Sequence, residues 1–191
     1  MSDFEPTKLI EPTFCDTQPP EERAFILGYV LSKDVFLPEG FLDKAAVRGN
    51  VLDLGCGRGS LGAALKTINR SINLFGVDIV TEYGGENFRE MYSELRKNDA
   101  AREVTEIKKI GQKFDLVVSF GLPPGVIEDL INEGEVTDIV KPEGSILLIF
   151  DAPIGASFLR MAEEAGFELH NGTFPSDPDI LYWHNGSKLR D

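Results

Sequence analysis

The residues with the clearest chemical potential form a glycine-rich segment that directly follows a short apolar run. The apolar run is Val51 to Leu54, and the glycines after it are Gly55, Gly57, Gly59 and Gly62. Glycines at this spacing let a ligand touch bare backbone, and the amides that open the next helix favour an anionic group. The segment is therefore predicted to be a ligand-binding turn between a strand and a helix.

Two glycine patterns overlap in this segment, and they imply different ligands. The three later glycines form GxGxxG, with Asp78 following 21 residues after the first of them, as in folds that bind a nicotinamide dinucleotide. The three earlier glycines form GxGxG behind an acidic residue, Asp53. At about 5 Å and an effective dielectric near 20, a carboxylate beside a pyrophosphate costs roughly 3 kcal/mol for each pair of like charges. Asp53 therefore disfavours a dinucleotide and favours a ligand with a cationic amino group, such as S-adenosylmethionine.

The segment from Val51 to Gly59 resembles the first motif of the class I S-adenosylmethionine-dependent methyltransferases. Asp78 resembles the acidic residue that ends their second strand, and Lys141 to Gly144 resembles their turn before the fifth strand. The resemblance spans roughly residues 50 to 185 and includes a C-terminal hairpin like theirs. It implies a Rossmann-like α/β fold that binds S-adenosylmethionine and transfers its methyl group.

The resemblance also implies roles for the residues around the turn. Gly55 to Gly57 would contact the methionyl part of the cofactor, and Asp53 would lie near its amino group or brace the loop. Asp78 would hold both ribose hydroxyls, with Ile79 against the adenine.

Two further segments complete the cofactor site that the resemblance implies. Asn98 to Ala100 is similar to the polar strand end that meets the adenine amine, although Asp99 is equally well explained without a ligand. Phe120 would cover the cofactor from the fourth strand. The full set of residues predicted to bind the cofactor is Asp53, Gly55, Cys56, Gly57, Gly59, Asp78, Ile79, Asp99, Ala100 and Phe120.

The elements that must position these residues are short strands alternating with helices. From Asn50 onward, apolar runs alternate with helical patterns, which is typical of crossover units on a parallel sheet. Strands are expected over residues 51–54, 72–78, 94–98, 114–120, 145–150, 167–174 and 180–184. Helices are expected around Leu61 to Ile68 and over residues 124–132, 135–141 and 156–165. The loop between the last two strands is too short for a crossover helix, so these strands must pair antiparallel.

The predicted fold is thus a doubly wound, mostly parallel, seven-stranded α/β sheet with a C-terminal antiparallel hairpin. Residues 1–49 are expected to form an N-terminal arm and a helix over Pro20 to Lys33, which by analogy is a candidate substrate lid. Residues 50–191 are expected to form the S-adenosylmethionine-binding domain.

Candidate residues for proton transfer are few. Ligands in open α/β sheets sit beyond the carboxyl ends of the parallel strands. Asp151 follows the fifth strand there and either binds or deprotonates a substrate or caps the next helix. His170 lies toward the same end of the sixth strand, although a lone histidine on a strand is more often structural. Methyl transfer from a sulfonium chiefly needs alignment of the nucleophile, so the sequence assigns no definite catalytic residue.

The segment from Ser119 to Gly125 follows the fourth strand at the same edge. It departs from the Asn/Asp-Pro-Pro-aromatic motif of amino methyltransferases, because Gly121-Leu122 precedes the two prolines and Gly125 replaces the aromatic residue. The departure argues against a nucleobase amine as the acceptor.

Composition narrows the remaining partners. The chain carries 19 basic and 32 acidic residues, a net charge of -13, which makes nucleic acid an unlikely partner and favours a small-molecule or peptidic acceptor. Cys15 and Cys56 have no metal-ligand spacing to either histidine, so no metal is expected.

No apolar run is long enough to cross a membrane, and the acidic N-terminal residues predict a cytoplasmic protein. The oligomeric state is left open. The alternatives are a non-catalytic cofactor-binding scaffold or, less favoured, an NAD-dependent oxidoreductase.

Overall fold

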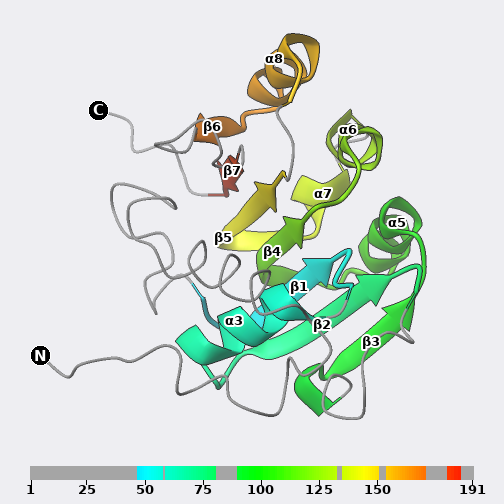
Figure 1. Cartoon of the computed structure of the whole chain (residues 1–191), viewed down its shortest axis with the longest axis vertical. Helices are drawn as coiled ribbons and strands as arrows, with labels where there is room; N and C mark the ends of the chain where they lie inside the picture. Colours follow the sequence, from blue (N-terminus) through cyan, green and yellow to red (C-terminus); the bar gives the residue numbers. More distant parts are fainter. Residues whose placement is uncertain are drawn as a thin grey trace, which may run out of the picture.

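The computed structural model describes residues 47–57, 59–80, 90–132, 135–150, 154–170 and 180–185. Strands and helices alternate along these residues (Figure 1). The strands are β1 (Asn50–Leu54), β2 (Asn73–Asp78), β3 (Glu94–Lys97), β4 (Phe114–Phe120), β5 (Val140–Ile149), β6 (Glu168–His170) and β7 (Ile180–His184). The helices are α3 (Ser60–Ile68), α5 (Ala100–Ile110), α6 (Pro124–Asn132), α7 (Glu135–Asp138) and α8 (Ala156–Glu164).

The strands form one seven-stranded sheet in the order β3-β2-β1-β4-β5-β7-β6. Every pair from β3 to β5 is parallel, whereas β7 runs antiparallel to both β5 and β6. This is the predicted architecture of a mostly parallel sheet that ends in an antiparallel hairpin. The carboxyl ends of β1, β2 and β4 therefore lie side by side at one edge, where the glycine turn begins.

Both faces of the sheet are buried, as expected for parallel strands covered by crossover helices. Val51 on β1 packs in a cluster that includes residues of α3, which lies across β1 and β2 (Figure 1). Its neighbour Leu52 points to the other face and packs in a cluster with residues of α5, α6 and α8. The alternation along β1 thus fixes which face Asp53 occupies: it shares the α3 face with Val51.

The start of β5 differs from the prediction. The sequence predicts a turn at Lys141 to Gly144 before a strand that begins at Ser145, but β5 already begins at Val140. Val140 pairs with Phe114, and the register then shifts so that Leu116 pairs with Ser145. Both Phe114 and Val140 are buried, so the apolar pairing places the intervening residues in an irregular part of the strand. For the same reason α7 ends at Asp138 and not at Lys141.

Some predicted features lie outside the described residues. They include the helix over Pro20 to Lys33, almost all of the N-terminal arm, and Asp151. The sixth strand is described as far as His170, and the rest of its predicted span to Phe174 lies outside the described residues. Among the helices that the structure describes, none combines the length and hydropathy needed for a membrane span.

Candidate functional site

The glycine turn joins β1 to α3 and has left-handed backbone at alternate positions. Gly55, Gly57 and Gly59 have φ angles of 71°, 50° and 81°. Residues other than glycine are disfavoured at these left-handed φ angles, so the GxGxG spacing matches the backbone conformation of the turn. A Cβ added at Gly57 would meet only the Gly55 carbonyl oxygen, at 3.9 Å, among the described residues. The backbone of Gly57 therefore borders open space, as a ligand-binding turn requires.

The turn is held against the end of β2 by backbone hydrogen bonds. The Gly55 and Cys56 amides both donate to the Val77 carbonyl oxygen, at 2.8 and 3.0 Å. The amide of Gly57 donates to Asp78 Oδ2 at 2.8 Å, and the amide of Val80 donates to Asp78 Oδ1 at 2.8 Å. Each carboxylate oxygen can accept more than one hydrogen bond, so Asp78 retains capacity for ligand hydroxyl groups.

Apolar side chains flank the turn on both sides. Ile79 directly follows β2 and is 65% exposed. Phe120 ends β4 and is half-buried. Leu122 packs so closely on the turn that a Cβ at Gly55 would lie 2.6 Å from its Cδ2 atom. Ile79 thus offers an uncovered apolar surface beside Asp78.

A buried acid lies beneath the turn. Asp53 is 1% exposed, and its Oδ2 accepts a hydrogen bond from the Tyr92 hydroxyl at 2.7 Å. Within the described part of the chain, its Oδ1 has no hydrogen-bond partner of normal geometry. Burial, together with the charge of Asp78, raises the pKa of Asp53 to about 7, while hydrogen bonds from the Tyr92 hydroxyl and the Gly62 backbone oppose the rise. The two predicted placements of Asp53, near the amino group of the cofactor or bracing the loop, both stay predictions.

Tyr92 is a residue of this site that the sequence did not indicate. It lies just before β3 and is 5% exposed. Two glycines make room for it, since a Cβ at Gly62 would lie 2.5 Å from its hydroxyl oxygen and one at Gly76 would lie 2.8 Å from its ring. Gly62 therefore serves close packing inside α3, unlike the three left-handed glycines before it. In the sequence, the glycines at positions 62 and 76 could have indicated a large side chain packed between this helix and this strand, but they do not identify which side chain it is.

Cys56 is not set up as a nucleophile. Its side chain is buried in the turn, and burial together with the nearby Asp53 and Asp78 carboxylates raises the pKa of the thiol. A thiol in such surroundings stays protonated and inert. The backbone of Cys56 is the part that the turn uses.

The end of β3 is tied to the site through Asn98. The Asn98 amide donates to the Asp78 carbonyl oxygen at 3.0 Å. Asp99 is exposed and caps α5, because its Oδ1 accepts from the Arg102 amide at 3.1 Å, and Ala100 is buried in the first turn of that helix. The cap explains Asp99 structurally, and its contact with a ligand stays a prediction.

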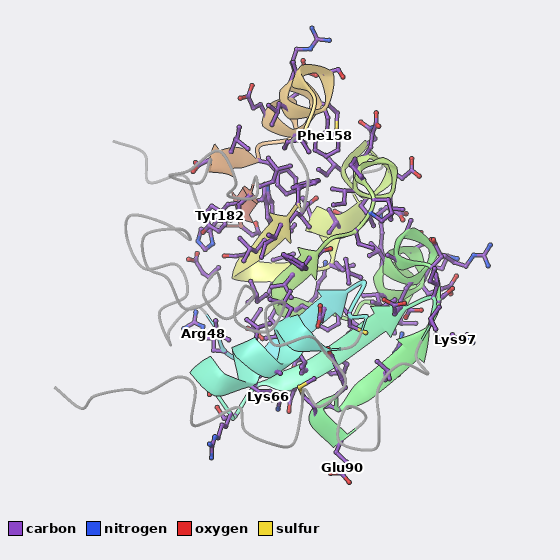
Figure 2. All side chains as sticks on the ribbon, in the orientation of Figure 1. Arg48, Lys66, Glu90, Lys97, Phe158 and Tyr182 are labelled. Carbon is purple, nitrogen blue, oxygen red and sulfur yellow. The ribbon has the colours of Figure 1, made fainter. Side chains whose placement is uncertain are left out.

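The structure does not bring His170 to the turn. His170 ends β6, the edge strand, and is separated from β1 by β4, β5 and β7. Four strand spacings of about 4.8 Å place its backbone about 19 Å from the end of β1. Figure 2 shows the breadth of the sheet, with Lys97 of β3 and Tyr182 of β7 toward opposite sides. The described site consists of the turn and the ends of β2, β3 and β4.

Comparisons of the sequence with known proteins give one short local similarity. No protein-family model matches the chain. A segment of 34 residues is 59% identical to ribosomal RNA small subunit methyltransferase C of Aliivibrio fischeri (strain MJ11), which is 18% of this chain and 10% of that protein. The chain thus spans about a tenth of the length of the curated relatives that it matches.

Two solved structures show the similarity of fold. Aeropyrum pernix fibrillarin, solved with natively bound S-adenosyl-L-methionine, matches with a TM-score of 0.56 at 14% identity over 87% of this chain and 74% of its own. The precorrin-6Y C5,15-methyltransferase of Geobacter metallireducens GS-15 matches with a TM-score of 0.56 at 16% identity over 86% of this chain and 88% of its own. The predicted class I methyltransferase fold is therefore confirmed.

Proposed function

We propose that this protein binds S-adenosylmethionine at the glycine turn and transfers its methyl group to an acceptor. The observation that carries the proposal is the turn itself, with left-handed glycines at alternate positions and Gly57 bonded to Asp78. Such a turn offers bare backbone and a ribose-binding carboxylate within one hydrogen bond of each other. The fibrillarin of the same fold was solved with S-adenosylmethionine bound, which supports the choice of cofactor.

The described residues fit this cofactor. The backbone of Gly57 borders the open side of the turn. The backbone of Gly55 to Gly57 would hold the methionyl group. Asp78 would accept hydrogen bonds from the ribose hydroxyls with the lone pairs that the two amides leave free. The exposed Ile79 would cover one face of the adenine, with Asp99 and Ala100 at its edge and Phe120 closing the site from β4.

The chemistry that the cofactor supplies is a methyl carbon activated by a sulfonium. The contribution of the chain is to align the acceptor with that carbon and to exclude water. The closely packed Leu122 and the half-buried Phe120 make the flank of the turn apolar, which suits water exclusion. Because His170 is remote from the turn, Asp151, two residues beyond β5, is our candidate for removing a proton where the acceptor carries one.

Two alternatives have less support. An NAD-dependent oxidoreductase would need a pyrophosphate beside the acidic Asp53. A non-catalytic scaffold would bind the cofactor at the same site but would not transfer its methyl group. Methyl transfer to an acceptor therefore distinguishes an enzyme from a scaffold.

For the acceptor we propose a small or peptidic molecule that is neutral or cationic. The support is electrostatic, since a chain of net charge -13 repels a phosphate backbone. An RNA acceptor is the second candidate, because the short curated match is to a ribosomal RNA methyltransferase.

The test is to incubate the protein with methyl-labelled S-adenosylmethionine and with separate small-molecule, protein and nucleic-acid fractions of a cell extract. Asp78→Ala, which is expected to bind the cofactor more weakly, is the matched control and should transfer less label when the cofactor is scarce. We expect enzyme-dependent label in the small-molecule or protein fraction. Label mainly in the nucleic-acid fraction would replace our acceptor with RNA. Cofactor binding without transfer to any fraction would indicate a scaffold, and NADH binding tighter than S-adenosylhomocysteine binding would refute the cofactor assignment.

A further inference from the structure

Tyr92 connects three parts of the site through one side chain. Its hydroxyl group donates a hydrogen bond to Asp53 on β1 and lies against Gly62 of α3. Its ring lies against Gly76 of β2. Both glycines are needed for this position, since a Cβ at either would approach Tyr92 to 2.8 Å or less. Glycine at these two positions thus leaves the space that lets the Tyr92 hydroxyl reach the buried Asp53 carboxylate.

The same stretch of β2 also carries the glycine turn. Gly76 holds the Tyr92 ring, Val77 accepts both turn amides, and Asp78 accepts the Gly57 amide. Asp53 lies on β1 two residues before Gly55, with only Leu54 between it and the turn. A change in the Tyr92–Asp53 contact therefore acts on the backbone that would hold the cofactor.

The surroundings of Asp53 lack a positive charge within the described residues. The titratable groups that act on it are Tyr92 and Asp78, and neither of them is a cation. Asp53 Oδ1 is buried without a hydrogen-bond partner among the described residues. An ionised Asp53 is therefore stabilised chiefly by the Tyr92 hydroxyl and to a smaller extent by the Gly62 backbone, and a cationic ligand at the turn would add the missing positive charge.

We propose that Tyr92 is a positioning residue of the cofactor site and that binding of the cationic cofactor releases a proton from Asp53. The inference rests on the proposed function. The proton passes from the Asp53 carboxyl group to solvent, and no bond to the cofactor forms or breaks. Tyr92 acts by stabilising the carboxylate that remains and by keeping it beneath the turn.

The coupling predicts how affinity changes with pH. Burial raises the pKa of Asp53 to about 7 in the free protein. If the complex holds Asp53 ionised, the dissociation constant falls by about tenfold from pH 6 to pH 8. Loss of the Tyr92 hydrogen bond raises the pKa of Asp53 further, because that bond stabilises the carboxylate. Tyr92→Phe should then bind about fivefold more weakly at pH 7 and approach wild-type affinity at pH 8.5.

The experiment is calorimetry with S-adenosylhomocysteine, which keeps the ammonium group, at pH 6 to 8.5 and in two buffers of different ionisation enthalpy. Wild type, Tyr92→Phe and Asp53→Asn are compared, and Tyr182→Phe removes a tyrosine hydroxyl from β7 as the matched control. We expect proton release and a pH-dependent affinity in wild type, a transition shifted to higher pH in Tyr92→Phe, and neither in Asp53→Asn after the ligand's own titration is subtracted. Tyr182→Phe should match wild type.

Other outcomes overturn the inference in distinguishable ways. Wild-type binding without proton release or pH dependence refutes the coupling and leaves the proposed function intact. A Tyr92→Phe profile that is uniformly weaker at all pH values reduces Tyr92 to a packing residue. If Tyr92→Phe does not fold, as judged by circular dichroism, the wild-type proton count and the Asp53→Asn profile still decide the matter. No binding of S-adenosylhomocysteine by wild type at any pH removes the proposed function and this inference together.

Discussion

Replacing Asp53 with asparagine should change how the stability of the protein depends on pH. Burial raises the pKa of Asp53 from 3.8 to about 7 in the folded state. Between those two values the folded state keeps a proton that the unfolded state releases, so the free energy of unfolding falls as pH rises through this window. One pKa unit corresponds to about 1.4 kcal/mol, so the whole window of about three units corresponds to about 4 kcal/mol.

Asparagine keeps the shape of the side chain and an acceptor for the Tyr92 hydroxyl but does not titrate. The other titrating groups are common to both proteins, so the difference between them isolates the contribution of Asp53. We expect the free energy of unfolding of wild type, relative to Asp53→Asn, to fall by about 3 kcal/mol between pH 5 and pH 8.

Urea unfolding followed by circular dichroism at pH 5, 6, 7 and 8 measures this difference. Asp129→Asn is the matched control, because Asp129 is exposed on α6. The control should follow the wild-type curve throughout. A difference between wild type and Asp53→Asn that stays constant from pH 5 to pH 8 would refute a buried, mostly protonated Asp53 at low pH.

Three other substitutions test the site. Asp78→Ala should weaken S-adenosylhomocysteine binding by about 1 to 3 kcal/mol in calorimetry, because two ribose hydroxyls lose a charged acceptor, and unchanged affinity in a folded variant would place the ribose elsewhere. Gly55→Ala should be less stable to urea than Gly111→Ala, because both glycines have a φ of 71° but only Gly55 has Leu122 against the added Cβ, and equal losses would mean that Leu122 moves aside freely. Ile79→Ser should leave the melting temperature unchanged and weaken S-adenosylhomocysteine binding severalfold, because the exposed side chain loses an apolar contact only in the complex. Equal affinity would remove Ile79 from the adenine site.

Elements with strong local signals were predicted to the residue. α6 occupies Pro124–Asn132 as expected, because proline suits the first turn and an apolar face follows it. β4 and β7 also have the predicted bounds, since each is an apolar or β-branched run between turn residues. The predicted start of β5 at Ser145 was wrong. The local pattern of Lys141 to Gly144 indicates a turn, whereas the pairing of Val140 with Phe114 depends on contacts between residues distant in sequence.

The site was predictable to the extent that it is local. The glycine turn is a continuous segment, and its backbone angles follow from the spacing of its glycines. The burial and protonation of Asp53 could not be predicted in this way, because its hydrogen-bond partner Tyr92 lies 39 residues away in sequence and no spacing rule connects them. The motif therefore identified the acid, while its burial and its raised pKa follow from how α3, β1 and β2 pack together.

The insertion of β7 between β5 and β6 constrains the order in which the chain can assemble during synthesis. In the described sheet β6 pairs only with β7, which follows it in sequence, so β6 cannot join until β7 has been made and inserted. Until then β5 presents an open edge whose residues Ile146 to Ile149 are almost fully buried in the finished fold. Open apolar edges are templates for pairing with other chains. A nascent chain that stops before Ile180 is thus expected to be aggregation-prone and to need chaperone protection, even though its glycine turn is already complete.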